Sequence, residues 1–584
     1  MPAKQKNYLP AIACALAPIF SYFVVRPYAE IGIDDDWGYI KTAQVLAQTG
    51  HLVYNGWEAA MLGWQAYFGA LLIKLFGFSF TAVRFSTVME AMVTAFLLQR
   101  VCIRAGLNSW NATLVTFTFV LSPVFLPLSF TFMSDVPGVF VIIVCLHMCL
   151  RAVQAENERS AMIWICLAAL ANAVGGTARQ IAWLGVLVMV PSTLWLLRRS
   201  RRVLLAGCIS WIVAAGIVAA AIHWFAHQPY ILPQALLPAR VGLREVASAA
   251  RIGLRYAGDL ALLALPVLLM FAPSLRSWNR RMAAVFAAGL LCFAVPGVAL
   301  IHAGKLQMWV APFLGDYMTT STLARLNVLT AHGTHLPVSS DVLQILLTGA
   351  VVLGIVLLVT SFFASATGPV AIQEDSGISW QNLGILLGPF SLAYIALLTS
   401  MVLQNQVFAF FNRYLLPLAI ILVLVLARYY QQRVHAHLPV FCAFLVGIFA
   451  VFGIVATHDM FALYRGYVSA IDQVLSSGVP ATAIEGPWEF ETWTETEALG
   501  YANDPRIRTP SGAYVPQPAH AYPSDCKPEW ILPWVPALKP AYRLSLDRSE
   551  CGGQLAFPPT MYRTWVGPHT NWIYTIRLPS PLPG

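Results

Sequence analysis

The sequence predicts an all-α polytopic membrane protein with a small extracytoplasmic α/β domain at its C-terminal end. Only 11% of the 584 residues are charged, whereas 58% are hydrophobic and the mean hydropathy is +0.66. A soluble domain usually carries about a quarter charged residues. Two further observations support the prediction, a series of long apolar runs and an alternation of basic residues between them.

The apolar runs are the candidate membrane spans. A helix needs about 20 mostly apolar residues to cross roughly 30 Å of hydrocarbon. The first candidate lacks a small-residue cleavage site, so we expect a retained span rather than a signal peptide. About thirteen runs qualify, near 9–25, 82–100, 111–128, 136–150, 161–177, 181–197, 203–224, 257–273, 282–301, 342–363, 382–400, 412–428 and 439–457.

Basic residues predict how these spans are oriented. Lys and Arg favour cytoplasmic connections, and with a cytoplasmic N-terminus every second connection is basic except the neutral 364–381 loop. The net charge of +9 fits this role in topology, and we expect no nucleic-acid partner. The basic residues concerned are Arg100, Arg104, Arg151, Arg159, Arg198, Arg199, Arg201, Arg202, Arg276, Arg280, Arg281, Arg428 and Arg433.

The remaining segments form two outer regions beside a multi-span domain of residues 1–457. In the first outer loop, 27–81, "YIKTAQVLAQTG" and "MLGWQAYFGALLIKLFG" predict two helices lying along the outer membrane surface, the first ended by Gly50. The long 225–256 and 302–341 stretches are expected as outer loops. In residues 458–584, "ALYRGYVSAIDQVLSSGVP" predicts a helix and "TAIEGPWEF" a strand and turn, which suggests a small mixed α/β domain.

The cysteines divide into two groups. Eight of the ten lie in apolar runs, where a free Cys behaves as a small hydrophobic residue. Cys526 and Cys551 lie in the C-terminal domain and are candidates for a disulfide if that domain is outside the cytoplasm. Two reduced thiols are the alternative.

The most informative short motif is "EIGIDDDWGYIKTAQ", which places Asp34, Asp35 and Asp36 just after the first apolar run. A carboxylate fixed at the membrane surface can act as a general base, or can orient an acceptor hydroxyl or a metal ion. The alternative is a solvated cluster at a helix N-terminus, where Asp is favoured. One Asp suffices for a cap, so three favour a functional site.

A second acidic position, Asp135 in "FTFMSDVPGVF", is predicted on the same side of the membrane. Alone, Asp135 is equally well explained as a helix N-cap before Pro137 and Gly138. Two carboxylate sites from separate loops could together hold an acceptor or a divalent cation. The shared side therefore favours a role for Asp135 in the same site.

Several basic residues on that side are candidates for binding a phosphate. Arg179 and Arg413 run against the cytoplasmic bias, and a guanidinium matches phosphate oxygens geometrically. Snorkelling toward lipid headgroups is the alternative, as an interfacial aromatic belt is for Tyr414. Arg84 and Lys74 are further candidates of the same kind.

Other chemistries lack their sequence signatures. The chain contains no P-loop, no GxGxxG run and no HExxH motif. His302, His332, His335 and His458 have no familiar metal-ligand spacing. Nucleotide-dependent reactions and zinc proteolysis therefore lose support.

These motifs together resemble the GT-C glycosyltransferases, and within them the branch that contains protein O-mannosyltransferases and the lipid A aminoarabinose transferase. "FMSDVP" around Asp135 is similar to that branch's second acidic position, and "RYLLPL", with Arg413 and Tyr414, to its late-span motif. The C-terminal segment "AIDQVLSSGVPATAIEGPWEF" looks like the tail of bacterial members. The residues matched in the first outer loop are Asp35, Asp36, Tyr39, Ala43, Leu46, Thr49, Gly50, Leu75, Phe76, Gly77 and Arg84.

The resemblance implies an inverting enzyme of a bacterial inner (plasma) membrane that acts in cell-envelope glycan biosynthesis. A sugar would pass from a polyprenyl-phosphate donor to a hydroxyl of a lipid, glycan or protein acceptor on the outer face. The likeness puts the catalytic Asp at Asp35 with Asp36 as its acidic neighbour, and leaves Asp34 open. No cofactor is implied with certainty, although a divalent cation is a candidate. The branch's Lys-Pro-Pro segment is replaced by "NGWEAAMLGWQAYFG", so we expect Arg84 or Arg179 to contact the donor phosphate.

Two other functions remain alternatives. A transporter or flippase of lipid-linked saccharides would place ionisable residues within its spans, and Glu90 is the main such residue here. A receptor or assembly scaffold would use the Trp- and Pro-rich C-terminal domain to bind a partner. The clustered outer acids favour the glycosyltransferase over both.

Overall fold

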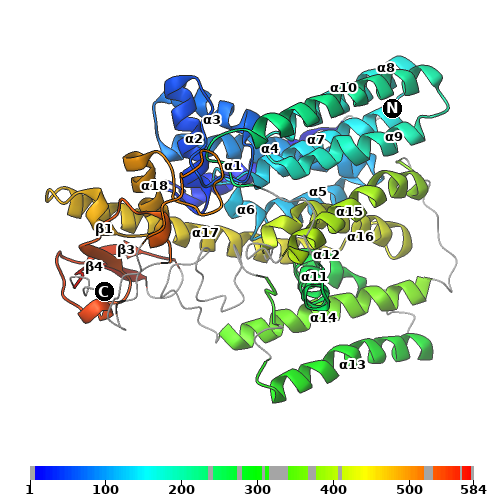
Figure 1. The fold of residues 1–584 in the computed structure, drawn as a ribbon. Helices are drawn as coiled ribbons and strands as arrows, with labels where there is room; N and C mark the ends of the chain where they lie inside the picture. Colours follow the sequence, from blue (N-terminus) through cyan, green and yellow to red (C-terminus); the bar gives the residue numbers. More distant parts are fainter. Residues whose placement is uncertain are drawn as a thin grey trace.

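The chain folds into a large assembly of helices with a small sheet near its C-terminal end (Figure 1). This computed structural model describes residues 7–233, 241–272, 279–305, 310–314, 340–365, 377–404, 411–517, 526, 530–565 and 569–579. The fold class predicted from the sequence, a helical polytopic protein with a small C-terminal α/β domain, is confirmed.

The N-terminal half is helical throughout, and polar caps fix where several helices begin. The side chains of Ser79, Asn108, Asn157 and Ser200 accept hydrogen bonds from the first turns of α4, α5, α8 and α10. Between α8 and α9, residues Gln180–Trp183 form a 3₁₀ turn and Gly185–Met189 a π turn. The helices are α1 Leu9–Val25, α2 Asp36–Thr49, α3 Gly63–Phe76, α4 Phe80–Arg104, α5 Ser109–Val120, α6 Phe125–Leu128, α7 Asp135–Val153, α8 Glu158–Gly175, α9 Val190–Leu196 and α10 Arg201–Ala226.

The C-terminal half continues with helices and ends in the sheet. A 3₁₀ turn, Asn412–Leu415, leads into α16. The elements are α11 Leu243–Leu263, α12 Leu265–Leu268, α13 Arg280–His302, α14 Ser340–Ser365, α15 Trp380–Leu403, α16 Leu416–Arg433, α17 Val440–Leu475, α18 Trp488–Leu499, β1 Ile484–Glu485, β2 Tyr542–Ser545, β3 Thr560–Arg563 and β4 Thr570–Arg577.

The predicted runs all contain helix, but the count of thirteen spans is not confirmed. Among the described residues, eight helices are long and apolar enough to cross a membrane, or nine if the bent pair 243–263 and 265–272 is one span. The expected 111–128 span is divided into α5 and α6. The expected 257–273 span is wrong in shape, because the helix begins at Leu243, inside the expected 225–256 loop, and bends by 70°. Pro266 at the start of α12 explains the break, since proline cannot continue the hydrogen-bond ladder.

The connections at one end of the helices contact one another as the charge alternation predicts. The backbone oxygen of Arg104, the last residue of α4, accepts hydrogen bonds from Gln154 Nε2 at 2.8 Å and Ile378 N at 3.3 Å. Arg428 Nη2 donates to Ile378 O at 2.6 Å. The described end of the neutral 364–381 loop therefore lies among the basic connections, whereas residues 366–376 are outside the described ones. Most of the expected 302–341 loop also lies outside them.

The two predicted helices of the first outer loop are present as α2 and α3. α2 ends where expected, at Gly50, whose φ of 76° suits a glycine helix end. Lys41 of α2 forms an ion pair with Glu497 of α18 and lies 4.7 Å from the ring centre of Trp493, so the C-terminal domain covers α2. α3 instead exposes an apolar side that includes Tyr67, Leu71, Leu75 and Phe76, as expected of a helix lying on a membrane.

The last predicted span and the helix predicted after it form one continuous helix, α17. Its 36 residues span about 54 Å at about 1.5 Å per residue, more than the roughly 30 Å hydrocarbon core. The expected domain boundary after residue 457 therefore falls inside this helix, which leads to the sheet (Figure 1). Gly466 lets the sheet approach, because a Cβ there would lie 3.0 Å from Ile573 and 3.1 Å from Tyr562.

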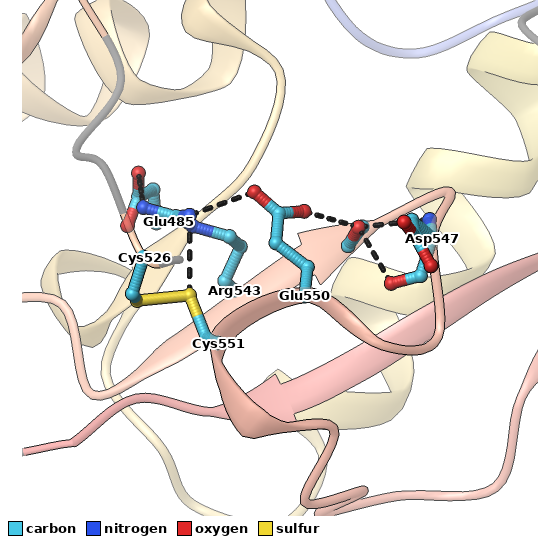
Figure 2. Close-up of a disulfide and its surroundings, with 7 residues drawn as sticks. Glu485, Cys526, Arg543, Asp547, Glu550 and Cys551 are labelled. Carbon is cyan, nitrogen blue, oxygen red and sulfur yellow. Dashed lines mark hydrogen bonds and ion pairs between the residues drawn. A yellow bond between two sulfur atoms is a disulfide. The ribbon is translucent and has the colours of Figure 1, made fainter. Parts of the chain in front are cut away.

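The C-terminal domain contains a four-stranded sheet of order β1-β2-β4-β3, in which only β1 and β2 are parallel. The residues predicted as a turn after β1 begin α18 at Trp488. Cys526 and Cys551 form a disulfide beside Arg543 (Figure 2). Arg543 donates to Glu485 at 2.8 Å and to Glu550 at 2.9 Å, and so joins β1, β2 and the turn that carries Cys551.

Candidate active site

Three carboxylates from two separate segments converge on one guanidinium, that of Arg413. Asp34 Oδ2 lies 2.5 Å from Nη1, Asp35 Oδ2 lies 3.2 Å from Nη2, and Asp135 Oδ2 lies 3.8 Å from Nε. The Arg413 side chain is 3% exposed, whereas those of Asp34 and Asp35 are 18% and 24% exposed. We call Asp34, Asp35, Asp135, Arg413 and Arg179 the acid cluster.

The local backbone explains how these groups meet. Asp34 lies in the turn between α1 and α2, which we call the acidic turn, residues 33–36, and its φ of 55° is a left-handed conformation that Asp tolerates better than most residues. Asp135 is the first residue of α7, and Arg413 lies in the 3₁₀ turn before α16. Asp135 and Arg413 therefore lie at or just before the start of a helix, and Asp34 lies in the turn that leads into α2.

Arg179 completes the cluster from the connection after α8. Its Nη1 lies 3.0 Å from Asp135 Oδ2 and donates to Ser134 Oγ at 2.9 Å. A Cβ at Gly138 would lie 3.0 Å from Arg179 Cδ, so the glycine leaves room for this side chain. The Arg179 side chain is 20% exposed. With three carboxylates and two guanidiniums, the cluster has a formal charge of −1.

Asp35 has the environment expected of a general base. Trp57 Nε1 donates a hydrogen bond to its Oδ1 at 2.8 Å, which orients the carboxylate. Burial, and then the charge of Asp34, raise the pKa of Asp35 to about 6, while Arg413 opposes the shift. A pKa near neutrality leaves the carboxylate ionised at pH 7 yet able to hold a proton.

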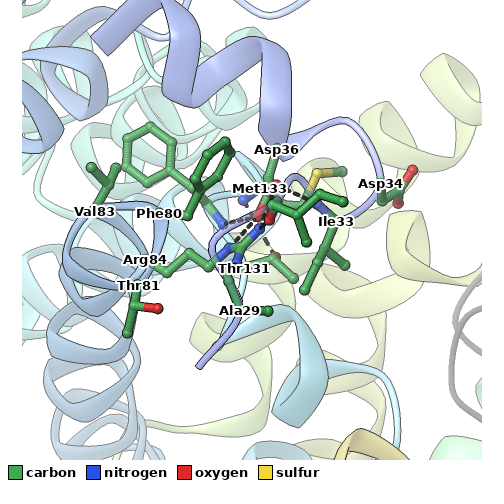
Figure 3. A network of polar contacts seen from close by, with 12 residues as sticks. Ala29, Ile33, Asp34, Asp36, Phe80, Thr81, Val83, Arg84, Thr131 and Met133 are labelled. Atoms are coloured by element: carbon green, nitrogen blue, oxygen red, sulfur yellow. Dashed lines mark hydrogen bonds and ion pairs between the residues drawn. The ribbon is translucent and has the colours of Figure 1, made fainter. Parts of the chain in front are cut away.

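Asp36 and Arg84 form a separate buried pair, and neither faces the cluster (Figure 3). Arg84 Nε and Nη2 donate to Asp36 at 2.7 and 3.0 Å, and the same guanidinium binds the backbone oxygens of Ala29 and Ile31. Asp36 also accepts from the backbone N–H of Ile33. The prediction of Asp36 as a catalytic neighbour and of Arg84 as a phosphate ligand is therefore not supported by this geometry, because the two residues brace the acidic turn.

The other predicted site residues lie at different distances from the cluster. Tyr39 is 7% exposed, and burial, then the charge of Asp35, raise its pKa well above the ordinary tyrosine value, while Arg179 and Arg413 oppose the rise. The Arg179 guanidinium lies over the ring of Tyr414, with its Cζ atom 5.3 Å from the ring centre. Lys74 is exposed in the last turn of α3. Tyr39 and Tyr414 thus belong to the cluster's surroundings, whereas no described contact joins Lys74 to it.

The chain is similar to several membrane glycosyltransferases of known structure. ArnT from Cupriavidus metallidurans, in the apo state, aligns at 13% identity over 81% of each chain with a TM-score of 0.36. The oligosaccharyltransferase AglB from Archaeoglobus fulgidus aligns at 12% identity over 92% of this chain and 64% of that one, with a TM-score of 0.38. The S. cerevisiae protein O-mannosyltransferase Pmt1-Pmt2 complex aligns at 14% identity over 37% of this chain and only 33% of the matched chain, with a TM-score of 0.30.

No protein-family model and no curated protein sequence matches the chain. Because the TM-scores to the solved structures are below 0.5, we assign no residue role from those likenesses. The acid cluster is interpreted from its own geometry.

A metal centre of the usual composition is not formed by the described residues, in which no group of three or more His, Cys, Asp or Glu side chains could hold an ion. In the acid cluster, Arg413 lies between the carboxylates. The divalent cation considered from the sequence stays a prediction.

Two residues that the sequence did not single out contact the acidic turn. Trp57 lies in the first outer loop, in the segment that replaces the expected Lys-Pro-Pro, and it orients Asp35. Glu489 of α18 accepts a hydrogen bond from the backbone N–H of Asp34 at 3.0 Å. Local pattern offers no signal for a contact between residues 455 positions apart. For Trp57, the sequence offers one signal, because this residue lies in the segment that differs from the expected Lys-Pro-Pro.

Proposed function

We propose that this protein is an inverting GT-C-type glycosyltransferase that moves a sugar from a polyprenyl-phosphate donor to an acceptor hydroxyl at the outer face of the membrane. The observation that carries the proposal is the convergence of Asp34, Asp35 and Asp135 on Arg413, with Asp34 and Asp35 partly exposed. A base beside fixed cations suits a reaction in which a hydroxyl loses a proton while a phosphate leaves.

In the proposed reaction, Asp35 accepts the proton of the acceptor hydroxyl. The acceptor oxygen forms a bond to the anomeric carbon as the bond from that carbon to the phosphate oxygen breaks, which inverts its configuration. The polyprenyl phosphate leaves with the electron pair. Arg179, the more exposed of the two guanidiniums, is the favoured ligand for this phosphate, and Arg413 fixes the two acids of the turn.

The proposal places the acid cluster and the C-terminal domain outside the cytoplasm, with the N-terminus inside. The basic connections at the opposite end of the helices support this orientation, because Lys and Arg favour the cytoplasmic side. A disulfide in the C-terminal domain also fits an oxidising compartment. The donor partner is a lipid-linked sugar, and the acceptor class stays open among lipid, glycan and protein.

The transporter alternative is favoured by one observation, the buried carboxyl of Glu90 in α4. Its side chain is 4% exposed, and neither oxygen has a hydrogen-bond partner among the described residues. Ionisable groups within spans often mark transport pathways. A transporter would move the lipid-linked sugar between leaflets without releasing polyprenyl phosphate.

The test uses the purified full-length protein in proteoliposomes that contain undecaprenyl-phosphate-linked radiolabelled hexoses or pentoses, with cell-envelope extract as the acceptor source. We expect D35N to lower transfer by about 10²–10⁴-fold, because a general base contributes a factor of this size. Glu30, in the same outer segment, provides the matched control E30Q, which removes the charge, keeps one of the two oxygens that accept from Ser79 and Phe80, and should retain transfer. Full transfer by D35N would refute the assignment of the base. Movement of the donor between leaflets without release of undecaprenyl phosphate would favour the transporter.

A further inference from the structure

The C-terminal domain contacts the acidic turn through one buried carboxyl group, that of Glu489. This residue lies in the first turn of α18 and is 2% exposed. Its Oε1 accepts a hydrogen bond from the backbone N–H of Asp34 at 3.0 Å and another from the hydroxyl of Tyr464, in α17, at 2.6 Å. A side chain remote in sequence therefore fixes the backbone of the acidic turn.

The chain is shaped for this contact. A Cβ at Gly32 would lie 2.4 Å from Trp37 Cβ, so the turn itself needs a glycine there, and 3.1 Å from Glu489 Cβ, so the absence of a side chain also eases the approach of α18. Asp34 has the left-handed φ of 55°. Glu489 accepts a hydrogen bond from the backbone N–H of Asp34, while Arg413 binds the Asp34 carboxylate.

Trp488, next to Glu489 in α18, packs against the residue that orients Asp35. The ring centres of Trp488 and Trp57 are 5.2 Å apart, and Trp57 donates to Asp35 Oδ1 at 2.8 Å. The first two residues of α18 thus contact the turn by two routes, directly at Asp34 and through Trp57 at Asp35.

We propose that Glu489 is a positioning residue of the transfer reaction, which holds the acidic turn so that Asp34 and Asp35 face the acceptor hydroxyl and Arg413. This inference rests on the proposed function. In this role, α18 of the C-terminal domain keeps the proposed base in place. The effect on rate can be large, because a shift of about 1 Å in a reacting group can cost about 10²-fold in rate.

The protonation of Glu489 indicates which substitution preserves its role. Burial, and the nearby charge of Asp34, raise the pKa of Glu489 to about 8, although the hydrogen bonds from Tyr464 and Asp34 oppose the rise. Asp34 and Tyr464 are the titratable groups that act on it. At neutral pH the carboxyl is mostly neutral, and a glutamine side chain has the same shape and keeps the accepting oxygen.

The experiment compares E489A, E489Q and Y464F with wild type in proteoliposomes, using undecaprenyl-phosphate-linked radiolabelled sugars and cell-envelope extract. Binding of undecaprenyl phosphate is followed separately by tryptophan fluorescence. We expect E489A to lower kcat by about tenfold to 10²-fold with unchanged affinity for undecaprenyl phosphate. E489Q should stay within about threefold of wild type, and Y464F should fall between them.

A matched control is available on the same helix. Glu495 is also buried and accepts one backbone N–H, at 2.8 Å, but from Ala537 within the C-terminal domain. E495A should perturb that domain to a similar degree and leave kcat within about threefold of wild type. Equal losses in E495A and E489A would overturn the inference, because general destabilisation would explain both.

The remaining outcomes separate this inference from the function on which it rests. If D35N is inactive, a wild-type kcat in E489A, or an equal loss of kcat in E489Q and E489A, would overturn the positioning role and leave the proposed function standing. If E489A does not fold, the kcat of Y464F is the test, and a wild-type value in that variant would overturn the inference. Full transfer by D35N would overturn the proposed function and this inference with it.

Discussion

Arg413 lowers the pKa of Asp35 against the larger effects of burial and Asp34, so its removal should shift the pH dependence of transfer. We consider R413Q, which removes the charge 3.2 Å from Asp35. Two unit charges at that distance attract by about 5 kcal/mol at an effective dielectric constant of about 20, which sets the upper bound. Opposite charges within about 4–6 Å usually lower a carboxyl pKa by about 1–3.

The sign of the effect follows from the state of Asp35. The proposed base must be ionised, and the pKa of Asp35 is about 6. Loss of Arg413 raises this pKa, so the acid limb of the rate profile should move up by about one to three pH units. A rise of about two units would leave about 10% of the base ionised at pH 7, against about 90% in the wild type. Activity at pH 7 should therefore fall roughly tenfold from this cause and return near pH 9.

The assay is the pH dependence of kcat/KM for transfer in proteoliposomes, with thermal unfolding in detergent to verify that each variant is folded. R413K is the companion variant, because it keeps the charge and loses the planar fork. Its acid limb should lie near that of the wild type even if its rate is lower. An R413Q profile with the wild-type acid limb near pH 6 would refute the argument.

Three further predictions concern other parts of the chain. D36N leaves the Arg84 guanidinium buried without its counter-charge and should lower the free energy of unfolding by about 3–5 kcal/mol, measured by thermal unfolding; an unchanged midpoint would contradict the bracing role. C526S opens a disulfide between residues 25 positions apart and should destabilise the C-terminal domain by about 3 kcal/mol. In the wild type, Cys526 and Cys551 should resist maleimide until they are reduced, and mass spectrometry of the labelled peptides separates them from free cysteines such as the exposed Cys292; rapid labelling of both without reductant would contradict the disulfide. E90Q removes the ionisable group of α4 at nearly constant volume and should leave transfer unchanged, whereas donor movement between leaflets that the wild type supports without transfer and that E90Q abolishes would favour the transporter.

The sequence was sufficient to predict the helical fold and that Asp34, Asp135 and Arg413 share one side of it. Apolar runs placed the helices, Gly50 ended α2, and the alternation of basic residues put Asp34, Asp135 and Arg413 at one end of the helices. Hydropathy measures length and composition only, so it did not reveal the 70° bend before Pro266.

The sequence does not show which aspartate of the acidic turn faces the acid cluster and which one is buried. Asp35 and Asp36 are identical neighbours in a motif, but helix α2 starts between them, and its first residue, Asp36, turns inward to Arg84. The contact of Glu489 with Asp34 depends on tertiary packing across almost the whole chain. Such contacts carry no local periodicity, and only the three-dimensional arrangement exposes them.

The most direct test of the central claim is the envelope composition of cells that lack this protein and are complemented with either wild type or D35N. Mass spectrometry would quantify lipid-linked sugars and envelope glycans in both strains. We predict that wild type restores one missing glycan modification and that D35N instead accumulates the polyprenyl-phosphate donor. Full restoration of the modification by D35N would contradict the account.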